Sequence, residues 1–477
     1  MTVPANRTGR DRSWLTRFRQ QVGLRWVLLL AVVISLLGLP EPPRANDKPA
    51  PGTTGHLVGH GGPVRAIAGD PLTGHLLTGS FDYAMMLWRI GDEGAARQVK
   101  RFDDHDGAVS AVAFHPDGKH ALSGSDDGAL HMWDLATAKR VRIFKGHGAK
   151  ILGLAIDRAG KRALTASWDR TVRLWDVASG KVIHTLKGHT GPVNAVAFTS
   201  SGDGLLSAAN DGTIRLWQAD TGALQRIAHR HGWGINVMRR LGDTDRYLFG
   251  ALDGTAAIFD LAANKINTTL KAHDKPVLSL AVLDKPGLIA TGGGGGHIRV
   301  YRQDDWKLLE SFHNPLGPVW AMAFADRGAR VYFGSLDDFA TSWQVKPRKP
   351  FEQVSGEFPR RFQVSKNLSL GERQFARKCS ICHTLTPNDA NRAGPTLHRI
   401  FGRKAGTLPN YPYSKALKSA NLTWNEETIG KLFSLGPHDY LPGSKMPLQQ
   451  ISDNAKRNAL IEFLKQSTGG PVKTDAN

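Results

Sequence analysis

Two cysteines and a histidine lie within the five-residue segment Cys379-Ser380-Ile381-Cys382-His383, and the 477-residue chain has no other cysteine. Two thiols three positions apart can add across the two vinyl groups of one haem, and the adjacent imidazole then lies against the iron. Cys-x-x-Cys-His is therefore a signature of c-type haem attachment. The segment predicts one covalent haem c, bound through Cys379 and Cys382, with His383 as an iron ligand.

Three other uses of a Cys-x-x-Cys pair stay open at this stage: a disulfide, a thioredoxin-like redox motif and half of a zinc site. A third and a fourth cysteine, which a zinc cluster would need, are missing from the sequence. No strand-helix redox context precedes the pair. Covalent haem is the favoured interpretation.

Met446 is the predicted sixth ligand of the iron, because it is the only methionine after His383. Pro442 and Gly443 precede it in a turn that could direct its sulfur inward, and His398 and His438 are the competing residues. Methionine with histidine is the pairing typical of cytochromes that transfer electrons, and a filled sixth position leaves no place for substrate on iron.

The charge of the chain is +20, and it is concentrated near the ends. Residues 1–45 contain seven arginines against two acidic residues, and residues 367–477 contain fifteen basic against eight acidic residues. A basic surface predicts steering of an acidic redox partner, either donor or acceptor. The sequence pI of about 10.0 suggests nucleic acid, but an exported chain makes that partner improbable.

Residues 1–45 predict a signal peptide or an N-terminal anchor. Residues 26–39 are uncharged and would span about 21 Å as a helix, short of the roughly 30 Å hydrocarbon core, which favours a secretory signal. An uncleaved anchor is the alternative, and it would be the sole link to a membrane. Both predict a periplasmic protein, and residues 46–55 form a spacer.

The middle of the chain repeats itself seven times. An aromatic residue recurs after 45 residues once and then every 42 residues, a histidine precedes six of the aromatics by 28 positions, and an aspartate precedes six of them by six positions. The aromatics are Trp88, Trp133, Trp175, Trp217, Phe259, Tyr301 and Trp343. Each unit contains short β-rich runs with turns at fixed offsets, which predicts antiparallel blades that bury their faces by stacking around an axis.

The pairs Gly59-His60, Gly146-His147, Trp133-Asp134 and Trp175-Asp176 make residues 56–345 resemble the WD-repeat family. The resemblance implies an all-β seven-bladed propeller with a His, Ser/Thr, Asp and Trp hydrogen-bond chain in each blade. Four sets match: His60/Thr78/Asp82/Trp88, His105/Ser123/Asp127/Trp133, His147/Thr165/Asp169/Trp175 and His189/Ser207/Asp211/Trp217. Blades five to seven replace parts of this chain by apolar packing.

Three further expectations concern the propeller. The segment His56-Leu57-Val58 occupies the phase of an outer strand and is expected to complete the blade that ends in Trp343. The Gly292 to Gly296 run is expected to form a hairpin. The histidines outside the repeat are expected to be mostly solvated: His75, His115, His120, His131, His184, His229 and His297.

Residues 346–366 are a predicted linker, 367–470 a second domain and 471–477 a tail. Ser369 and Glu372 match an N-terminal capping box, so a helix should begin there and deliver both thiols on consecutive turns. Six motifs of this second domain make residues 367–467 resemble the class I, mitochondrial-type cytochrome c family, which implies an all-α domain. The motifs are Gly371 to Phe375, Cys379 to His383, Gly394 to His398, Phe401 to Lys404, Leu422 to Trp424 and Tyr440 to Met446.

The cytochrome c resemblance also implies roles for individual residues. The carbonyl of Pro395 would accept a hydrogen bond from His383, and Arg403, Tyr413 and Trp424 would surround a buried haem propionate. The C-terminal helix, through Phe463, would cross the first helix near Gly371 and Phe375. Phe433 departs from the family, because most members have there a tyrosine that donates a hydrogen bond to the methionine sulfur.

The leading hypothesis is an exported c-type cytochrome that carries single electrons through one His/Met-ligated haem, with the propeller as the module that docks a redox partner. The alternatives are a haem-containing oxidoreductase whose propeller binds a second cofactor or substrate, and a scaffold in which the haem is a sensor. Whether the protein is an enzyme stays open, and the electron carrier is favoured.

Overall fold

The computed structural model describes residues 55–348 and 368–469, apart from positions 71–72, 92–93, 272, 316, 381, 388–393, 410, 412, 445 and 447–448. The predicted signal or anchor, most of the spacer and linker, and the tail lie outside the described residues.

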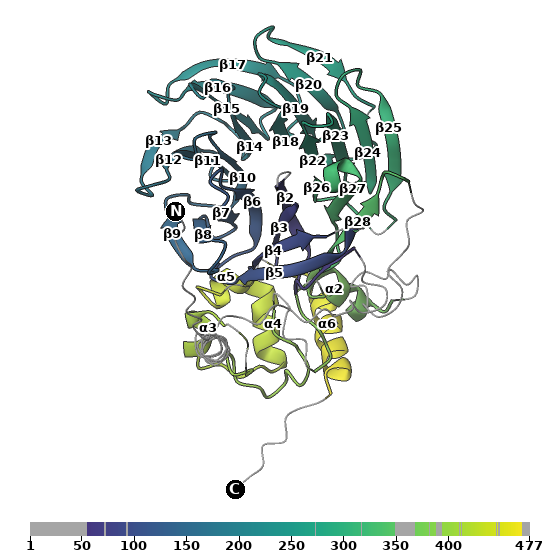
Figure 1. Cartoon of the computed structure of the whole chain (residues 1–477). Coiled ribbons are helices and arrows are strands. Elements are labelled where there is room, and N and C mark those ends of the chain that lie inside the picture. Colours follow the sequence, from purple (N-terminus) through teal and green to yellow (C-terminus); the bar gives the residue numbers. More distant parts are fainter. Residues whose placement is uncertain are drawn as a thin grey trace, which may run out of the picture. The chain divides into compact units, whose positions relative to one another are not determined.

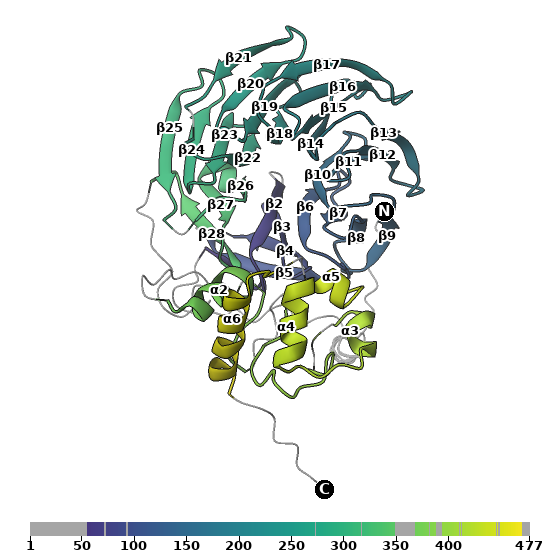
Figure 2. The ribbon, with the colours of Figure 1, turned by 180° about the vertical axis from the view of Figure 1, so that it is seen from behind.

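Seven four-stranded antiparallel sheets follow one another from Leu57 to Gln344, and Figures 1 and 2 show them as blades around one axis. Blades one to six run from an inner strand to an outer strand in sequence order, as the short runs and turns of each repeat predict. Blades one to four are β2 (Val64–Asp70), β3 (His75–Ser80), β4 (Met85–Ile90), β5 (Ala96–Phe102); β6 (Val109–Phe114), β7 (His120–Ser125), β8 (Leu130–Asp134), β9 (Arg140–Phe144); β10 (Ile151–Ile156), β11 (Arg162–Ser167), β12 (Val172–Asp176), β13 (Val182–Leu186); and β14 (Val193–Phe198), β15 (Gly204–Ala209), β16 (Thr213–Gln218), β17 (Leu224–Arg230). Blades five to seven are β18 (Ile235–Arg240), β19 (Arg246–Ala251), β20 (Ala256–Asp260), β21 (Lys265–Thr269); β22 (Val277–Leu283), β23 (Leu288–Gly293), β24 (His297–Arg302), β25 (Leu308–His313); and β26 (Ala321–Ala325), β27 (Arg330–Gly334), β28 (Phe339–Gln344), β1 (Leu57–Val58).

The ring is closed by β1, the first strand of the chain. It pairs antiparallel with β28, with Leu57 opposite Ala340 and Val58 opposite Phe339. This is the pairing expected from the phase of the repeat, and it is confirmed. The seventh blade therefore takes its outer strand from a segment 281 positions away in sequence, counted from Val58 to Phe339.

Polar chains stabilise the first four blades. In blade three, His147 Nδ1 donates to Asp169 at 2.8 Å, His147 Nε2 lies 2.7 Å from Thr165 Oγ1, and Trp175 Nε1 donates to the same hydroxyl at 2.8 Å. Blades one and four have the same three contacts. Each buried polar group thereby has a partner, which offsets its desolvation.

Blade two keeps two of these contacts: His105 to Ser123 at 2.6 Å and Trp133 to Ser123 at 2.7 Å. Its aspartate, Asp127, accepts from the backbone N–H of Asp106 at 3.1 Å and of Ala129 at 2.7 Å. Blade five replaces the hydroxyl and the tryptophan by the fully buried Phe249 and Phe259, so the predicted apolar packing is confirmed there.

The expectation that the non-periodic histidines are mostly solvated is wrong for His131. Its side chain is buried, and its ring stacks on that of His105 with 4.0 Å between the centroids and 10° between the planes. The reason is register, because His131 pairs across the sheet with Ser123 and so lies on the face that holds the polar chain. Burial lowers the pKa of His131 to about 3, which keeps the ring neutral.

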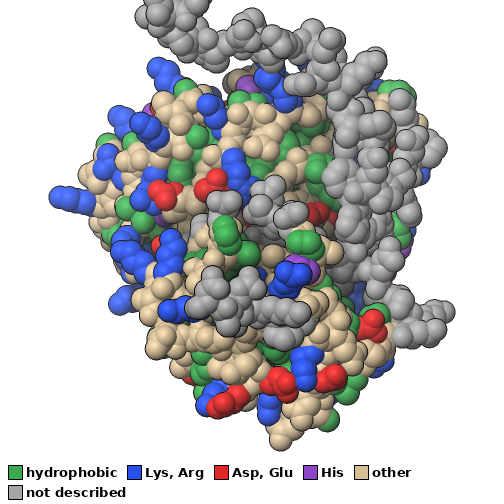
Figure 3. Space-filling model, turned by 90° about the horizontal axis from the view of Figure 1, so that it is seen from below, with side chains coloured by type: hydrophobic (Ala, Val, Ile, Leu, Met, Phe, Trp, Pro, Cys, Tyr) green, Lys and Arg blue, Asp and Glu red, His purple; other side chains and the backbone are tan. Residues whose placement is uncertain are grey.

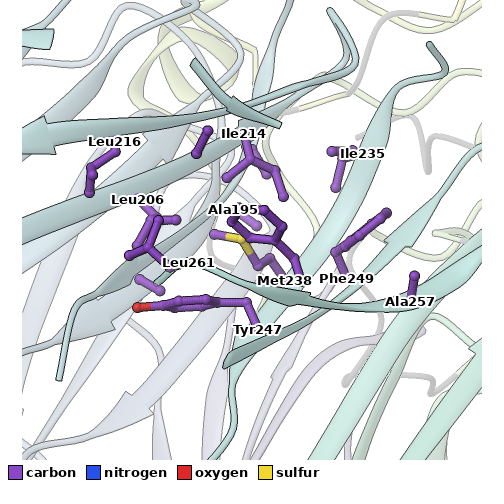
Figure 4. Packing of buried hydrophobic residues seen from close by; sticks show 14 of the residues in the cluster. Ala195, Leu206, Ile214, Leu216, Ile235, Met238, Tyr247, Phe249, Ala257 and Leu261 are labelled. Carbon is purple, nitrogen blue, oxygen red and sulfur yellow. The ribbon is translucent and has the colours of Figure 1, made fainter. Parts of the chain in front are cut away.

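The core consists of clusters between adjacent blades. Figure 4 shows the largest of them, where Leu206 and Ile214 of blade four meet Met238, Tyr247 and Phe249 of blade five. The glycine run forms a hairpin as expected, since β23 ends at Gly293 and β24 begins at His297.

The C-terminal part is helical: α2 (Leu370–Lys378), α3 (Lys415–Ser419), α4 (Glu426–Leu435), α5 (Pro437–Tyr440) and α6 (Asn454–Ser467). The predicted capping box is present, with Ser369 N–H donating to Glu372 at 2.8 Å and Glu372 N–H donating to Ser369 Oγ at 3.2 Å. A single bridge joins Lys404 to Thr423. Within the described residues, each helix is too short or too polar to span a bilayer.

Helices α2 and α6 cross in close contact, as expected. A Cβ at Gly371 would lie 2.2 Å from the carbonyl oxygen of Ala459, so only glycine allows this approach. Phe375 and Phe463 pack beside the crossing with ring centroids 5.5 Å apart. The crossing fixes the helix that leads to the two cysteines.

Candidate functional site

The two thiols stand at the C-terminal end of α2. Cys379 is the C-cap of the helix, so the expectation that a continuous helix delivers both thiols is corrected. A further turn follows, in which the N–H groups of Cys382 and His383 donate to the carbonyl of Cys379 at 3.0 and 2.9 Å. In the described part of the chain the cysteines are not joined in a disulfide, and burial raises the pKa of Cys379 to about 12.

His383 is oriented by a backbone carbonyl. Its Nδ1 lies 2.7 Å from the oxygen of Pro395, and because a carbonyl can only accept, Nδ1 carries the proton and Nε2 keeps its lone pair. Burial also lowers the pKa of His383, which favours the neutral, ligating imidazole. The contact implied by the resemblance is thus present.

A cavity with about 130 Å³ of water-accessible space lies beside these residues. All eight predicted site residues line it: Cys379, Cys382, His383, Pro395, Arg403, Tyr413, Trp424 and Met446. The sequence-predicted residues, which span 68 positions, are therefore brought together in space.

His398, one of the two competitors of Met446, does not share this position. His398 is not among the residues that line the cavity, and its ring lies beside Gly469. The side chain of His438 is outside the described part of the structure. Phe433 lines the cavity and is 4% exposed, so the position where the family usually has a tyrosine is apolar here.

Arg403 and Tyr413 carry the polar chemistry on the far side of the cavity. Arg403 donates to the carbonyl oxygens of Thr396 at 2.7 Å and His398 at 3.2 Å, and burial lowers its pKa. Burial raises the pKa of Tyr413, so its hydroxyl stays a donor. The backbone N–H of Trp424 donates to Arg403 at 3.0 Å, which ties these residues together.

Gly394 begins one of the motifs of the cytochrome c resemblance, but sequence reasoning gave it no role at the site. A Cβ there would lie 2.4 Å from Cε1 of His383 and 2.6 Å from Nδ1, closer than any real side chain allows. The imidazole is thus seated against bare backbone. The adjacent Gly-Pro pair was the available signal, but only the fold shows what faces it.

We expect Gly394→Ala to displace His383 and to lower haem incorporation several-fold, because overpacking costs roughly 1–3 kcal/mol. Haem content per chain and the visible spectrum of the purified protein measure this. Gly430→Ala is the matched control, since its Cβ would meet Ile461 at an ordinary 3.7 Å in the middle of α4. The control should gain roughly 0.5–1 kcal/mol of stability. Equal haem content in both variants would contradict the seating.

The residues fit a haem c. Two thiols, a neutral imidazole with Nε2 available and a methionine line one cavity, and apolar side chains such as Leu432 and Phe433 enclose it. A closed structural zinc site needs four ligands of cysteine, histidine or carboxylate type, and this set offers three. Cys379 and Cys382 would hold the group through thioether bonds, and His383 and Met446 would offer a nitrogen and a sulfur to its iron.

Comparison with known proteins finds relatives of both the propeller and the helical domain. The family described as "WD domain, G-beta repeat" matches residues 52–89, 96–134, 138–176, 180–218 and 264–302. Residues 219–263 and 303–345, which hold blades with substituted polar chains, fall outside these matches.

Proteins named cytochrome c are similar to about a fifth of the chain. That of Cochliobolus lunatus is 39% identical over 98 residues, covering 20% of this chain and 90% of the relative. That of Chlamydomonas reinhardtii is 39% identical over 102 residues, 21% of this chain and 90% of the relative. That of Ginkgo biloba is 38% identical over 98 residues, 20% of this chain and 86% of the relative. By one domain the chain belongs to the cytochrome c family, and that domain is fused to a WD-repeat β-propeller.

Proposed function

We propose that the protein is an exported class I c-type cytochrome that carries single electrons through one covalent haem, with the propeller as the module that docks its redox partner. The observation that carries the proposal is the lining of one cavity by Cys379, Cys382, His383 and Met446, with His383 oriented by the carbonyl of Pro395.

When bound, the haem would supply a one-electron change at iron. The chain would supply the rest: Cys379 and Cys382 would hold the group, His383 would offer Nε2 to the iron, and Met446 would offer its sulfur. A thioether ligand favours ferrous iron and raises the potential. Phe433 beside it cannot donate a hydrogen bond to the sulfur, so the sulfur keeps its full donor strength toward the metal.

Arg403, Tyr413 and Trp424 would hold a propionate. The guanidinium of Arg403 already donates to two carbonyl oxygens, which fixes its plane, and it is largely buried. A carboxylate placed there would recover the solvation that the guanidinium loses by burial. Charge-assisted hydrogen bonds of this type are the stronger ones in proteins.

Export rests on residues 1–45 alone. An arginine-rich start, an uncharged block and a following proline are typical of a secretory signal, and covalent haem attachment outside the cytoplasm is consistent with it. A periplasmic location follows if the signal is cleaved, and an N-terminal anchor follows if it is retained.

The proposed partner is a redox protein with acidic surface. On the face in Figure 3, Lys and Arg side chains stand singly among acidic and apolar ones, so the attraction would come from the summed positive charge. Such steering raises association rates and weakens with salt, since the Debye length is about 10 Å at 0.1 M. A rate of electron exchange that does not change with ionic strength would contradict electrostatic steering.

The test of the function is spectroscopic. A reduced-minus-oxidised spectrum of the purified protein should show one low-spin haem per chain, and ferrous protein should not bind carbon monoxide readily because Met446 fills the sixth position. Met446→Ala should bind it at once. Gln449→Ala, which alters another cavity-lining residue, should behave as the wild type. Rapid binding by the wild type would instead favour the sensor or the oxidoreductase, and a second chromophore would favour the oxidoreductase.

A further inference from the structure

The seven inner strands of the propeller surround a central channel, around which Figures 1 and 2 show the blades arranged. The channel has a narrow segment with about 200 Å³ of water-accessible space and a wide segment with about 1250 Å³. All seven inner strands line both segments, which share lining residues, among them Arg239.

Arg239 differs from the residues at the equivalent position of the other inner strands. Its counterpart is alanine in each of the six other inner strands, and all seven residues line the wide segment. The six are Ala68, Ala113, Ala155, Ala197, Ala281 and Ala323. A collar of methyl groups leaves room near the axis, and one long cationic side chain is placed in it.

The direction of the Arg239 side chain follows from its place in strand β18. Figure 4 shows Met238 among Leu206, Leu261 and Tyr247 in the core between blades four and five, and its side chain is fully buried. Consecutive side chains of a strand point to opposite faces, so Arg239 points away from that core. Arg239 is exposed, and it lines both segments of the channel.

The charge of Arg239 has no acidic partner in the described part of the chain. Its guanidinium makes a long contact, from Nη1 to the carbonyl oxygen of Met238 at 3.5 Å. The guanidinium is exposed and lines the channel, so it is available to an anion that enters there.

Among the described residues, one other charged residue lines the narrow segment. The narrow segment is lined by two arginines and by no acidic residue, and the second arginine, Arg65, lies against the rings of Trp320 at 5.1 Å and Phe81 at 5.4 Å. Asp126 also acts on Arg65.

In the wide segment, two of the three lining acids already have cationic partners. Asp157 pairs with Arg162 at 2.9 Å, and Asp243 pairs with Arg158 at 3.3 Å and Arg240 at 3.7 Å. The third, Asp284, forms no ion pair with Arg239 among the described residues. Positive charge at Arg239 is therefore left for a ligand.

We propose that the central channel of the propeller is a binding site for a small oxyanion, a phosphate or a carboxylate, held by the guanidinium of Arg239. A guanidinium presents its N–H donors as a fork that matches two oxygens of such a group. The site is independent of the haem, so a lack of anion binding would leave the proposed electron-transfer function intact.

The test uses the full-length haem protein in a chloride-poor buffer, with inorganic phosphate and malonate as probes in separate calorimetric titrations. We expect saturable binding of one probe per chain, and a dissociation constant raised roughly tenfold or more in Arg239→Ala, since hydrogen bonds to charged groups contribute about 1.5–3 kcal/mol. Arg239→Lys should retain part of the affinity. The tighter probe shows whether the site prefers phosphate or carboxylate.

Arg240→Ala is the matched control, because it removes the same charge from the next residue of the strand, where Asp243 already pairs with it. It should bind the probe within about twofold of the wild type. Arg239→Ala restores the residue of the six other blades, so it should fold. No saturable binding at millimolar probe, or equal binding by Arg239→Ala, would overturn the proposal.

Discussion

Replacement of both cysteines, Cys379→Ser with Cys382→Ser, should abolish covalent haem. Serine has nearly the same shape as cysteine but forms no thioether bond, so packing at the end of α2 is kept while attachment is lost. Haem staining of a denaturing gel should fall to background, and intact mass should fall by one haem. Each single variant should keep its stain through the remaining thioether.

The stability of the domain should fall with the attachment. The cavity is enclosed by apolar side chains, and a bound haem would fill it and pack against them. Binding at 1,000 times the dissociation constant stabilises a fold by about 4 kcal/mol, and a tethered group exceeds that regime. We expect a loss of about 4 kcal/mol or more in the unfolding transition of the helical part.

Ser380→Ala is the control for this experiment. It lies between the cysteines, and its hydroxyl donates to the carbonyl of Ala376 at 2.7 Å. Loss of that hydrogen bond should cost about 1 kcal/mol and leave the haem stain intact. A stain that persists in the double serine variant would show that the haem is held elsewhere.

Leu57→Asp should have the largest effect on the propeller. Leu57 is fully buried in β1 and packs in a cluster with Tyr332 and Ala340 of blade seven. Truncating such a leucine costs roughly 2–5 kcal/mol, and a buried carboxylate adds to that. We expect a loss of roughly 4 kcal/mol or more, because the seventh blade loses its outer strand and the ring opens.

Leu309→Asp is the matched control, since Leu309 is on the outer strand β25 of blade six and is 41% exposed. It should change stability by no more than about 0.5 kcal/mol. Denaturant unfolding followed by circular dichroism in the β region compares the two variants. If Leu57→Asp unfolds at the same denaturant concentration as Leu309→Asp, closure by β1 does not hold the ring together.

The two proposals concern different parts of the chain and different chemistry. The haem site consists of residues that the Cys379 to His383 motif and the other cytochrome c motifs already predict. The channel site depends on one arginine, Arg239, in a ring of alanines. Anion binding at the axis would give the propeller a ligand besides a protein partner, and it can be measured without following electron transfer.

The sequence by itself determined the repeat, its closure and the haem motif. These are local or periodic signals: the polar chain of a blade recurs at fixed offsets, such as His147, Thr165 and Trp175, and Cys379 to His383 are contiguous. Even the pairing of β1 with β28 follows from the phase of the repeat. The capping box of α2 was likewise readable, because Ser369 and Glu372 interact within one turn.

Only the tertiary structure decided what meets across distance. The seat of His383 against Gly394, the stacking of His131 on His105 and the end of α2 at Lys378 each depend on how separate segments pack. Alignment of the repeats alone would have shown Arg239 opposite six alanines, but not that this position faces the channel. Seven strands from the whole ring build that channel, so its charge balance exists only after the ring has closed.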